Sequence, residues 1–330
     1  MSATGRERTG GFGWKADIGC NWMMGLIVKT TPSPTKGSIP KVKMKPVVFI
    51  QSNDRQALAA RISAFSIRRN ARDAESFDVK IMDVHDHPRL VQKGQSIKRA
   101  GHIRRWDPDD LQSFTPLRFF PPQAMGFEGR ALVIDPDVFA IGDVCELFDR
   151  DLEGKAIWAR PRPGHNNETN YIATSVMLLD CAKLGHWQFD DELDALFAHR
   201  FDYTDWMALR REDPATIGYL EPGWNDFDTL APRTKLLHTS KRRTQPWKTG
   251  LPVDYTLRER GFLYPVRQLL AQRYQRHPDP RQEALVYSLL AEMIDCGEFT
   301  TQEVRRGMGA DHLRHDSLEL VERYRGWQIS

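Results

Sequence analysis

Short apolar runs of strand type alternate along the chain with segments that have helical spacing. Most of these runs are uninterrupted, as in strands that are buried on both faces. Helical spacing follows the first run at residues 58–70 and recurs at 191–200. This alternation predicts an α/β fold with a mixed, mainly parallel sheet flanked by helices. The predicted strands are 47–50, 77–82, 131–134 and 172–179.

Two polar loops directly follow predicted strands. Asp135 and Asp137 come after the run 131–134, and residues 52–54 come after the first strand. Ligands of parallel α/β sheets bind beyond the carboxyl ends of the strands. We therefore expect both loops to lie at the binding edge of the sheet.

The tripeptide Asp135-Pro136-Asp137 has the residues of a metal site. In an extended chain, residues two positions apart point to the same side, so both carboxylates can converge on one cation. Oxygen ligands suit Mg²⁺ or Mn²⁺, which keep positions open for substrate phosphates. The alternative is a solvated turn, because Asp-x-Asp also occurs in this chain without a clean strand before it. These other pairs are Asp107 and Asp109, Asp149 and Asp151, and Asp226 and Asp228.

Composition constrains the function less than the motifs do. The 330 residues are 40% hydrophobic and 28% charged, which is ordinary for a soluble protein with a sizeable core. The net charge is +3, but residues 1–45 carry eight Lys/Arg against two acidic residues, which leaves −3 for the rest. A body without a basic excess argues against a nucleic-acid partner. The four cysteines lack Cys-x-x-Cys spacing, so they suit a reducing compartment better than a zinc ribbon or a disulfide framework.

The two ends of the chain differ from its middle. Residues 1–45 are rich in Gly, Ser, Thr, Pro and Lys. They predict a disordered basic extension, which is either a solvated tail or a contact with anionic lipid. Met44 precedes the first strand and is a second candidate start. We expect no export signal and no transmembrane helix. Amphipathic patterns at 264–274 and 281–293, and an N-cap at Thr300, predict a C-terminal helical region, 257–330.

Taken in order, five segments resemble the nucleotide-sugar glycosyltransferases of the GT-A fold, particularly those of family 8. Tyr203-Thr204-Asp205 also resembles the family's Ser-Asp-Gln element, and residues 220–225 resemble its Leu-Pro-x-x-Trp-Asn element. The resemblance covers roughly residues 46–256, which it implies form a GT-A-like catalytic domain. The five segments are 47–54, 114–118, 131–148, 173–180 and 238–247.

The resemblance implies three metal ligands. The family's Asp-x-Asp falls on Asp135 and Asp137, and the histidine of its His-x-x-Gly-x-x-Lys-Pro-Trp motif falls on His238. These residues would hold Mn²⁺ or Mg²⁺ at the donor diphosphate, where a cation neutralises the charge that develops on the leaving group. An imidazole ligand favours Mn²⁺ over Mg²⁺. Apart from the resemblance, His238 would be a surface histidine beside a basic cluster.

The segment after His238 departs from the family pattern. Lys241 replaces the family's glycine, the motif is one residue longer, and Gln245 corresponds to its phosphate-binding lysine. Another cation is then needed at the diphosphate. Four residues are candidates for this cation, and the choice among them remains open. They are Lys241, Arg242, Arg243 and Lys248. The two lysines of this set are assigned to the donor site.

Further residues are implied on the donor and acceptor sides. Arg118 corresponds to an arginine near the donor, although a surface arginine is an almost equal alternative. Asp205 is assigned as the catalytic residue that orients an acceptor hydroxyl. Trp224 and Asn225 would shape the acceptor cleft, unless Trp224 simply packs. The residues at the end of the first strand are assigned to binding the base and ribose of the donor nucleotide. They are Gln51, Ser52, Asn53 and Asp54.

The expected function is a metal-dependent, hexosyltransferase-like glycosyltransferase that uses a UDP-linked sugar and retains configuration. Its acceptor would be a carbohydrate, lipid-linked or protein hydroxyl. The resemblance suits polysaccharide biosynthesis in the cytoplasm, with peripheral contact at the inner face of the membrane. One alternative is a non-catalytic scaffold with a degraded donor site. Another is a nucleotidyltransferase, which ranks last because the loop after the first strand lacks glycine.

Overall fold

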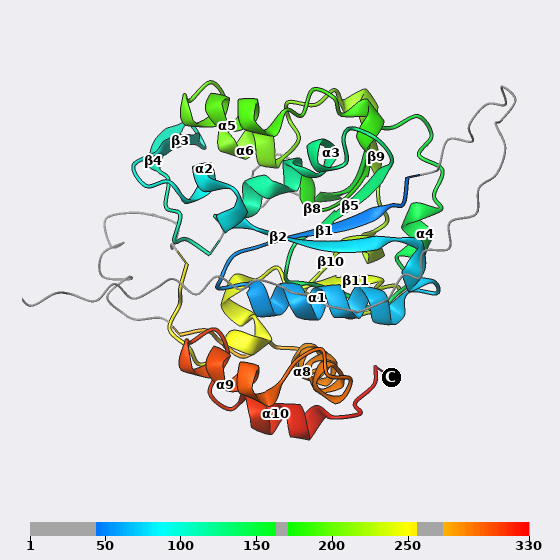
Figure 1. Ribbon diagram of the computed structural model, residues 1–330, viewed down its shortest axis with the longest axis vertical. Helices are drawn as coiled ribbons and strands as arrows, with labels where there is room; N and C mark the ends of the chain where they lie inside the picture. Colours follow the sequence, from blue (N-terminus) through cyan, green and yellow to red (C-terminus); the bar gives the residue numbers. More distant parts are fainter. Residues whose placement is uncertain (1–43, 112, 163–170, 256–272, 330) are drawn as a thin grey trace, which may run out of the picture. The chain divides into compact units, whose positions relative to one another are not determined.

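A six-stranded sheet with strand order β2-β1-β5-β8-β7-β9 lies at the centre of the computed structural model, which describes residues 44–111, 113–162, 171–255 and 273–329 (Figure 1). Strand β1 is parallel to β2 and β5, and β7 is parallel to β9. Strand β8 is antiparallel to β5 and β7. The predicted α/β class with a mixed, mainly parallel sheet is confirmed. The strands are β1 Val47–Ser52, β2 Asp78–Asp83, β5 Arg130–Ile134, β7 Ile157–Arg162, β8 Tyr171–Asp180 and β9 Ile217–Tyr219.

Apolar clusters cover both faces of this sheet. In β1, Val47 and Phe49 enter one cluster, while Val48 and Ile50 enter the other. Because successive side chains of a strand point to opposite faces, burial on both sides produces the uninterrupted apolar run. Helices α2, α5 and α6 contribute to the first cluster, and α1 and α4 to the second. The helices are α1 Ala57–Asn70, α2 Pro88–Val91, α3 Pro121–Ala124, α4 Cys145–Phe148, α5 Phe189–Phe197 and α6 Tyr203–Met207.

Two smaller sheets complete the β structure. Strands β3 Ser96–Arg99 and β4 His102–Arg105 form an antiparallel hairpin. A three-stranded sheet has the order β10-β11-β6, with bounds Asp226–Phe227, Leu236–His238 and Val138–Ala140. Its register pairs His238 with Val138 in antiparallel strands. This pairing brings His238 next to the loop that follows β5.

The C-terminal helices pack against α1, on the side away from the main sheet (Figure 1). They are α8 Pro280–Asp295, α9 Thr301–Gly309 and α10 Ser317–Tyr324. The predicted helix at 281–293 and the capping box of Thr300 with Glu303 are both confirmed. Of the helix predicted at 264–274, residues 264–272 lie outside the described residues. Arg273 forms an isolated bridge with Pro252, and Tyr274 is not helical, so the prediction is wrong at its end.

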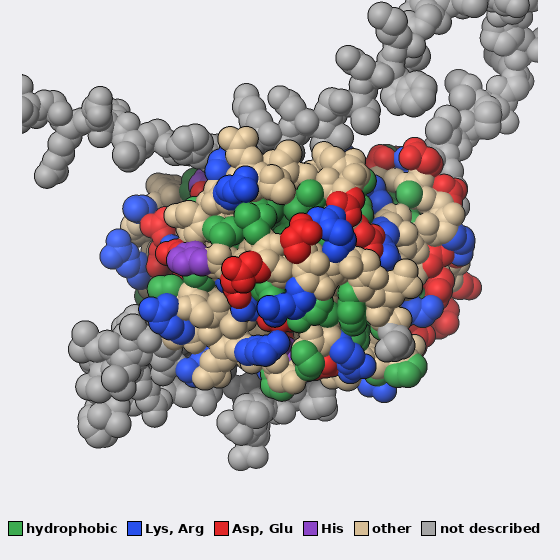
Figure 2. Space-filling model, turned by 90° about the horizontal axis from the view of Figure 1, so that it is seen from below, with side chains coloured by type: hydrophobic (Ala, Val, Ile, Leu, Met, Phe, Trp, Pro, Cys, Tyr) green, Lys and Arg blue, Asp and Glu red, His purple; other side chains and the backbone are tan. Residues whose placement is uncertain are grey.

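Ion pairs border the contact between α1 and the C-terminal helices. Arg61 pairs with Glu303 at 2.9 Å, and Arg68 pairs with Glu298 at 3.2 Å. Figure 2 shows the molecule from the side of the C-terminal helices, where Lys/Arg and Asp/Glu side chains are interspersed with apolar ones. Within the part of the chain that the structure describes, no helix has the length and apolar character to cross a membrane.

Candidate functional site

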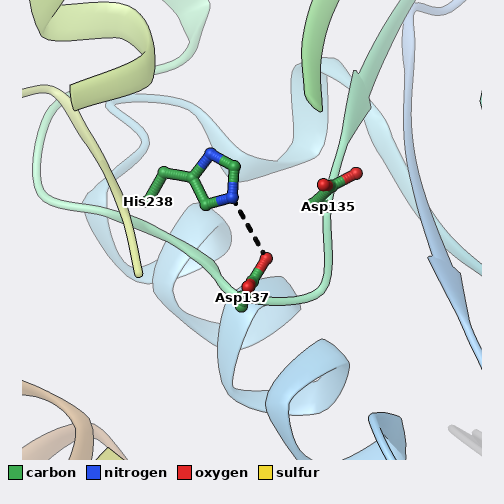
Figure 3. A group of neighbouring side chains, drawn as sticks. All are labelled: Asp135, Asp137 and His238. Carbon is green, nitrogen blue, oxygen red and sulfur yellow. Dashed lines mark ion pairs between the residues drawn. The ribbon is translucent and has the colours of Figure 1, made fainter. Parts of the chain in front are cut away.

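Three predicted metal ligands meet at the carboxyl end of β5. Asp135, Asp137 and His238 are buried, and one ligand atom from each lies within 4.8 Å of the others. Figure 3 shows the imidazole on β11 facing the Asp137 carboxylate on the loop after β5. The loop is a turn, since the Val138 N–H donates to the Asp135 carbonyl at 3.2 Å. The carboxylates therefore converge through a turn and not, as expected, through an extended chain.

A hydrogen bond to Asn225 sets the orientation of His238. The Asn225 side-chain nitrogen donates to Ser175 Oγ at 3.0 Å, so its Oδ1 faces His238 Nδ1 at 2.9 Å as an acceptor. Nδ1 must then carry the proton, which leaves the lone pair of a neutral imidazole on Nε2. Nε2 lies 3.4 Å from Asp137 Oδ1. The ring thus presents its ligating atom to the cluster.

Arg118 and Gln51 hold Asp135. Arg118 Nε donates to Asp135 Oδ1 at 2.8 Å, and its Nη2 donates to Oδ2, in a bidentate pair. The side-chain nitrogen of Gln51 donates to the same carboxylate. Burial raises the pKa of Asp135 above its ordinary value; Arg118 opposes this shift, and the charge of Asp137 adds to it.

Gln245 holds the second carboxylate. Its side-chain nitrogen donates to Asp137 Oδ2 at 3.0 Å, and its Oε1 lies 3.5 Å from the side-chain nitrogen of Gln56. Sequence reasoning noted Gln245 only as a departure and missed Gln56. A polar residue near the start of a helix after β1 was the available signal for Gln56, but many residues share it.

A small pocket opens at the cluster. Its wall combines two carboxylates and two guanidinium groups, together with amide and hydroxyl groups and an apolar side. Such a wall suits a polar ligand with charged and hydrogen-bonding groups. The lining residues are Gln56, Leu111, Phe114, Thr115, Arg118, Asp135, Pro136, Asp137, Arg242 and Gln245.

The other residues assigned to the donor base and ribose lie at the end of β1. Ser52 and Asn53 are buried, and Asn53 Oδ1 accepts from the Gln56 N–H at 3.2 Å, just before α1. Asp54 is half-buried, and its carboxylate lies 3.3 Å from His85 Nε2. Of the four residues at this strand end, Gln51 is the one with a hydrogen bond to the carboxylate cluster among the described contacts.

The two lysines assigned to the donor have different surroundings. Lys241 is exposed, and its backbone N–H donates to Asp228 Oδ1 at 3.0 Å. Lys248 is fully buried, and its ammonium pairs with Asp254 at 2.7 Å. Neither lysine lines the pocket at the cluster.

The residues assigned to the acceptor side do not form one group. Asp205 pairs with Arg210 at 2.9 Å on the exposed side of α6. Trp224 is buried in the apolar cluster between the main sheet and α1. Asn225 is fully buried behind His238, so its described contacts position the histidine.

Comparisons with known proteins return glycosyltransferases among the solved structures. The galactosyltransferase LgtC, solved with donor and acceptor sugar analogs, is 14% identical over 61% of this chain and 89% of its own, with a TM-score of 0.42. GlyE from Streptococcus pneumoniae is 16% identical over 77% of this chain and 64% of its own, with a TM-score of 0.45. Mouse xyloside xylosyltransferase 1 is 16% identical over 59% and 95%, with a TM-score of 0.39. Neither a family model nor a curated protein sequence matches the chain.

Proposed function

We propose that the chain is a metal-dependent glycosyltransferase that moves a sugar from a UDP-linked donor to a hydroxyl acceptor, with retention of configuration. The observation that carries the proposal is the buried cluster of Asp135, Asp137 and His238 at the carboxyl edge of the sheet. Carbohydrate, lipid-linked and protein hydroxyls are the proposed acceptors, and the cytoplasmic side of a membrane is the proposed place.

The residues present fit a divalent cation. Two carboxylates and an imidazole nitrogen form a donor set that Mn²⁺ accepts, and Mg²⁺ accepts less readily. The buried Gln51 Oε1 has no hydrogen-bond partner among the described residues, although its amide nitrogen binds Asp135. Asp135, Asp137 and His238 would hold the ion, which when bound supplies positive charge to the leaving diphosphate.

The chain's own residues orient these groups. Asn225 keeps the proton of His238 on Nδ1, and Arg118 and Gln245 each hold one carboxylate. Fixed donors and charges of this kind stabilise developing charge without reorganising during the reaction. Asp205 is proposed to orient the acceptor hydroxyl after a rearrangement that releases it from Arg210.

A second candidate is a non-catalytic nucleotide-binding or scaffold protein. Its supporting observation is the neutral Gln245 at the position of the family's phosphate-binding lysine. This protein would bind metal and nucleotide through the same cluster. It would show no metal-dependent hydrolysis or transfer of the donor even at high protein concentration.

Thermal unfolding with UDP, GDP and CDP, each with and without Mn²⁺, tests the proposal. We expect stabilisation that needs both Mn²⁺ and UDP and is lost in Asp135→Asn/Asp137→Asn. The matched control is Asp107→Asn/Asp109→Asn, which changes the exposed Asp-Pro-Asp of the same chain. Stabilisation by no nucleotide contradicts a donor site. Stabilisation without turnover of UDP-sugars favours the scaffold, and NMR of the product anomer tests retention.

A further inference from the structure

The two arginines of the pocket have different contacts. Arg118 uses Nε and Nη2 on Asp135, and its Nη1 donates to Thr174 Oγ1 at 2.9 Å. Its charge is therefore matched by a buried carboxylate. Arg242 reaches the same pocket from the short 3-10 helix Arg242–Thr244, which follows β11 and His238.

The residue three positions further on, Gln245, contributes no charge to the pocket. Its amide nitrogen donates to Asp137, and the residue is almost fully buried. Its described contacts thus hold a carboxylate of the cluster in place. A ligand with several negative charges needs a cation from another residue.

The neighbouring cations are less suitable. The Lys248 ammonium is fully buried against Asp254. Lys241 and Arg243 flank Arg242 in sequence, but neither lines the pocket. Arg242 lies over the Tyr255 ring, with its guanidinium carbon 4.9 Å from the ring centroid. A guanidinium group over an aromatic face is attracted to the ring, so this contact restricts where the charged end of Arg242 lies.

We propose that Arg242 is the cation that binds the diphosphate of the donor. This inference rests on the proposed function. A guanidinium group can donate two parallel hydrogen bonds to phosphate oxygens, which an amide at position 245 cannot match in charge. In this chain, Gln245 positions Asp137, and the diphosphate contact belongs to Arg242.

Isothermal titration calorimetry on the full chain tests this assignment, with UDP, GDP, CDP and UMP titrated in the presence of Mn²⁺. We expect Arg242→Ala to weaken binding of the preferred nucleoside diphosphate about 10- to 100-fold. UMP binding should fall much less, and titration of Mn²⁺ alone should be unchanged. Arg242→Lys should lose less than Arg242→Ala because the charge remains. Arg305→Ala, on exposed α9, is the charge-matched control.

Several outcomes overturn the inference. One is wild-type affinity in Arg242→Ala, and another is an equal loss for UDP and UMP. A larger loss in Lys241→Ala or Arg243→Ala assigns the contact to that residue instead. These results leave the proposed function standing, whereas a wild-type protein that binds no nucleoside diphosphate overturns both. Circular dichroism of each variant checks folding, and Arg242→Gln provides a second neutral substitution of similar length.

Discussion

The carboxyl edge of the main sheet and the C-terminal helical layer are both buried, but they are built from different groups. At the edge, Asp135 and Asp137 lie close together and are held by polar side chains. In the helical layer, side chains such as Leu290 and Val304 form an apolar cluster with α1. Like charges brought together in a buried site oppose folding, whereas apolar burial favours it. We therefore expect the edge to bind the ligand and the helical layer to stabilise the fold.

The largest expected effect lies in the helical layer. Leu290→Ala removes a fully buried side chain of α8 and should lower the free energy of unfolding by about 2–5 kcal/mol. Urea unfolding measures this change, and Mn²⁺ affinity should stay at the wild-type value. Leu290→Met, which keeps the volume, should cost less than about 1.5 kcal/mol. A loss of Mn²⁺ affinity in a folded Leu290→Ala protein would break the comparison.

The next effect lies at the carboxyl edge of the sheet, where a substitution should weaken metal binding without lowering stability. Asp137→Asn keeps the side-chain shape but removes a charged ligand, so Mn²⁺ affinity should fall by about 100-fold or more. The urea midpoint without metal should not fall, because the repulsion between two buried carboxylates is removed. Calorimetry and urea unfolding give the two readings, with exposed Asp109→Asn as control. Unchanged Mn²⁺ affinity would exclude Asp137 as a ligand.

A smaller effect is expected one contact further from the cluster. Asn225→Ala removes the acceptor that faces His238 Nδ1, and Mn²⁺ affinity should fall about 10- to 100-fold. Asn225→Asp keeps an acceptor at this place and should retain more affinity. If both variants bind Mn²⁺ equally well, the orientation of His238 does not depend on this residue.

The smallest effect is expected at the border of the helical layer. Arg69 makes a two-point contact with Glu292, including Nη2 to Oε1 at 2.8 Å, but both side chains are partly exposed. Arg69→Ala should lower the free energy of unfolding by no more than about 1 kcal/mol, and high salt should make this loss smaller. A loss as large as that of Leu290→Ala would mean that ion pairs, and not apolar burial, hold the layer.

Sequence patterns predicted β1, β5 and β8 because burial on two faces leaves a readable apolar run. Periodic spacing predicted β2 and the helices α1 and α5, whereas β7 and β9 were not predicted. Asp135 and Asp137 were found because they adjoin one such run. The direction of β8 could not be predicted, since a buried run reads the same in a parallel or an antiparallel strand. His238 came from a family resemblance, because the pairing of β11 with β6 sets its place.

Contacts between distant side chains escaped prediction. Lysine is rarely fully buried, so the Lys248–Asp254 pair has no signal in the sequence. The contact of Asn225 with His238 likewise depends on how two loops meet. Motif order located the cluster, but it could not say which neighbours hold each ligand.

The double packing of α1 has a consequence for the order of events during synthesis. Its Ala60 and Ala64 pack toward the sheet, while Ala59 and Ile62 pack with the C-terminal helices. The ribosome completes α1 early and α8 late, because these helices lie near opposite ends of the described chain. A nascent chain that has already formed the sheet still carries an apolar stripe on α1 that α8 has not yet covered, and exposed apolar surface of this kind favours aggregation until α8 emerges.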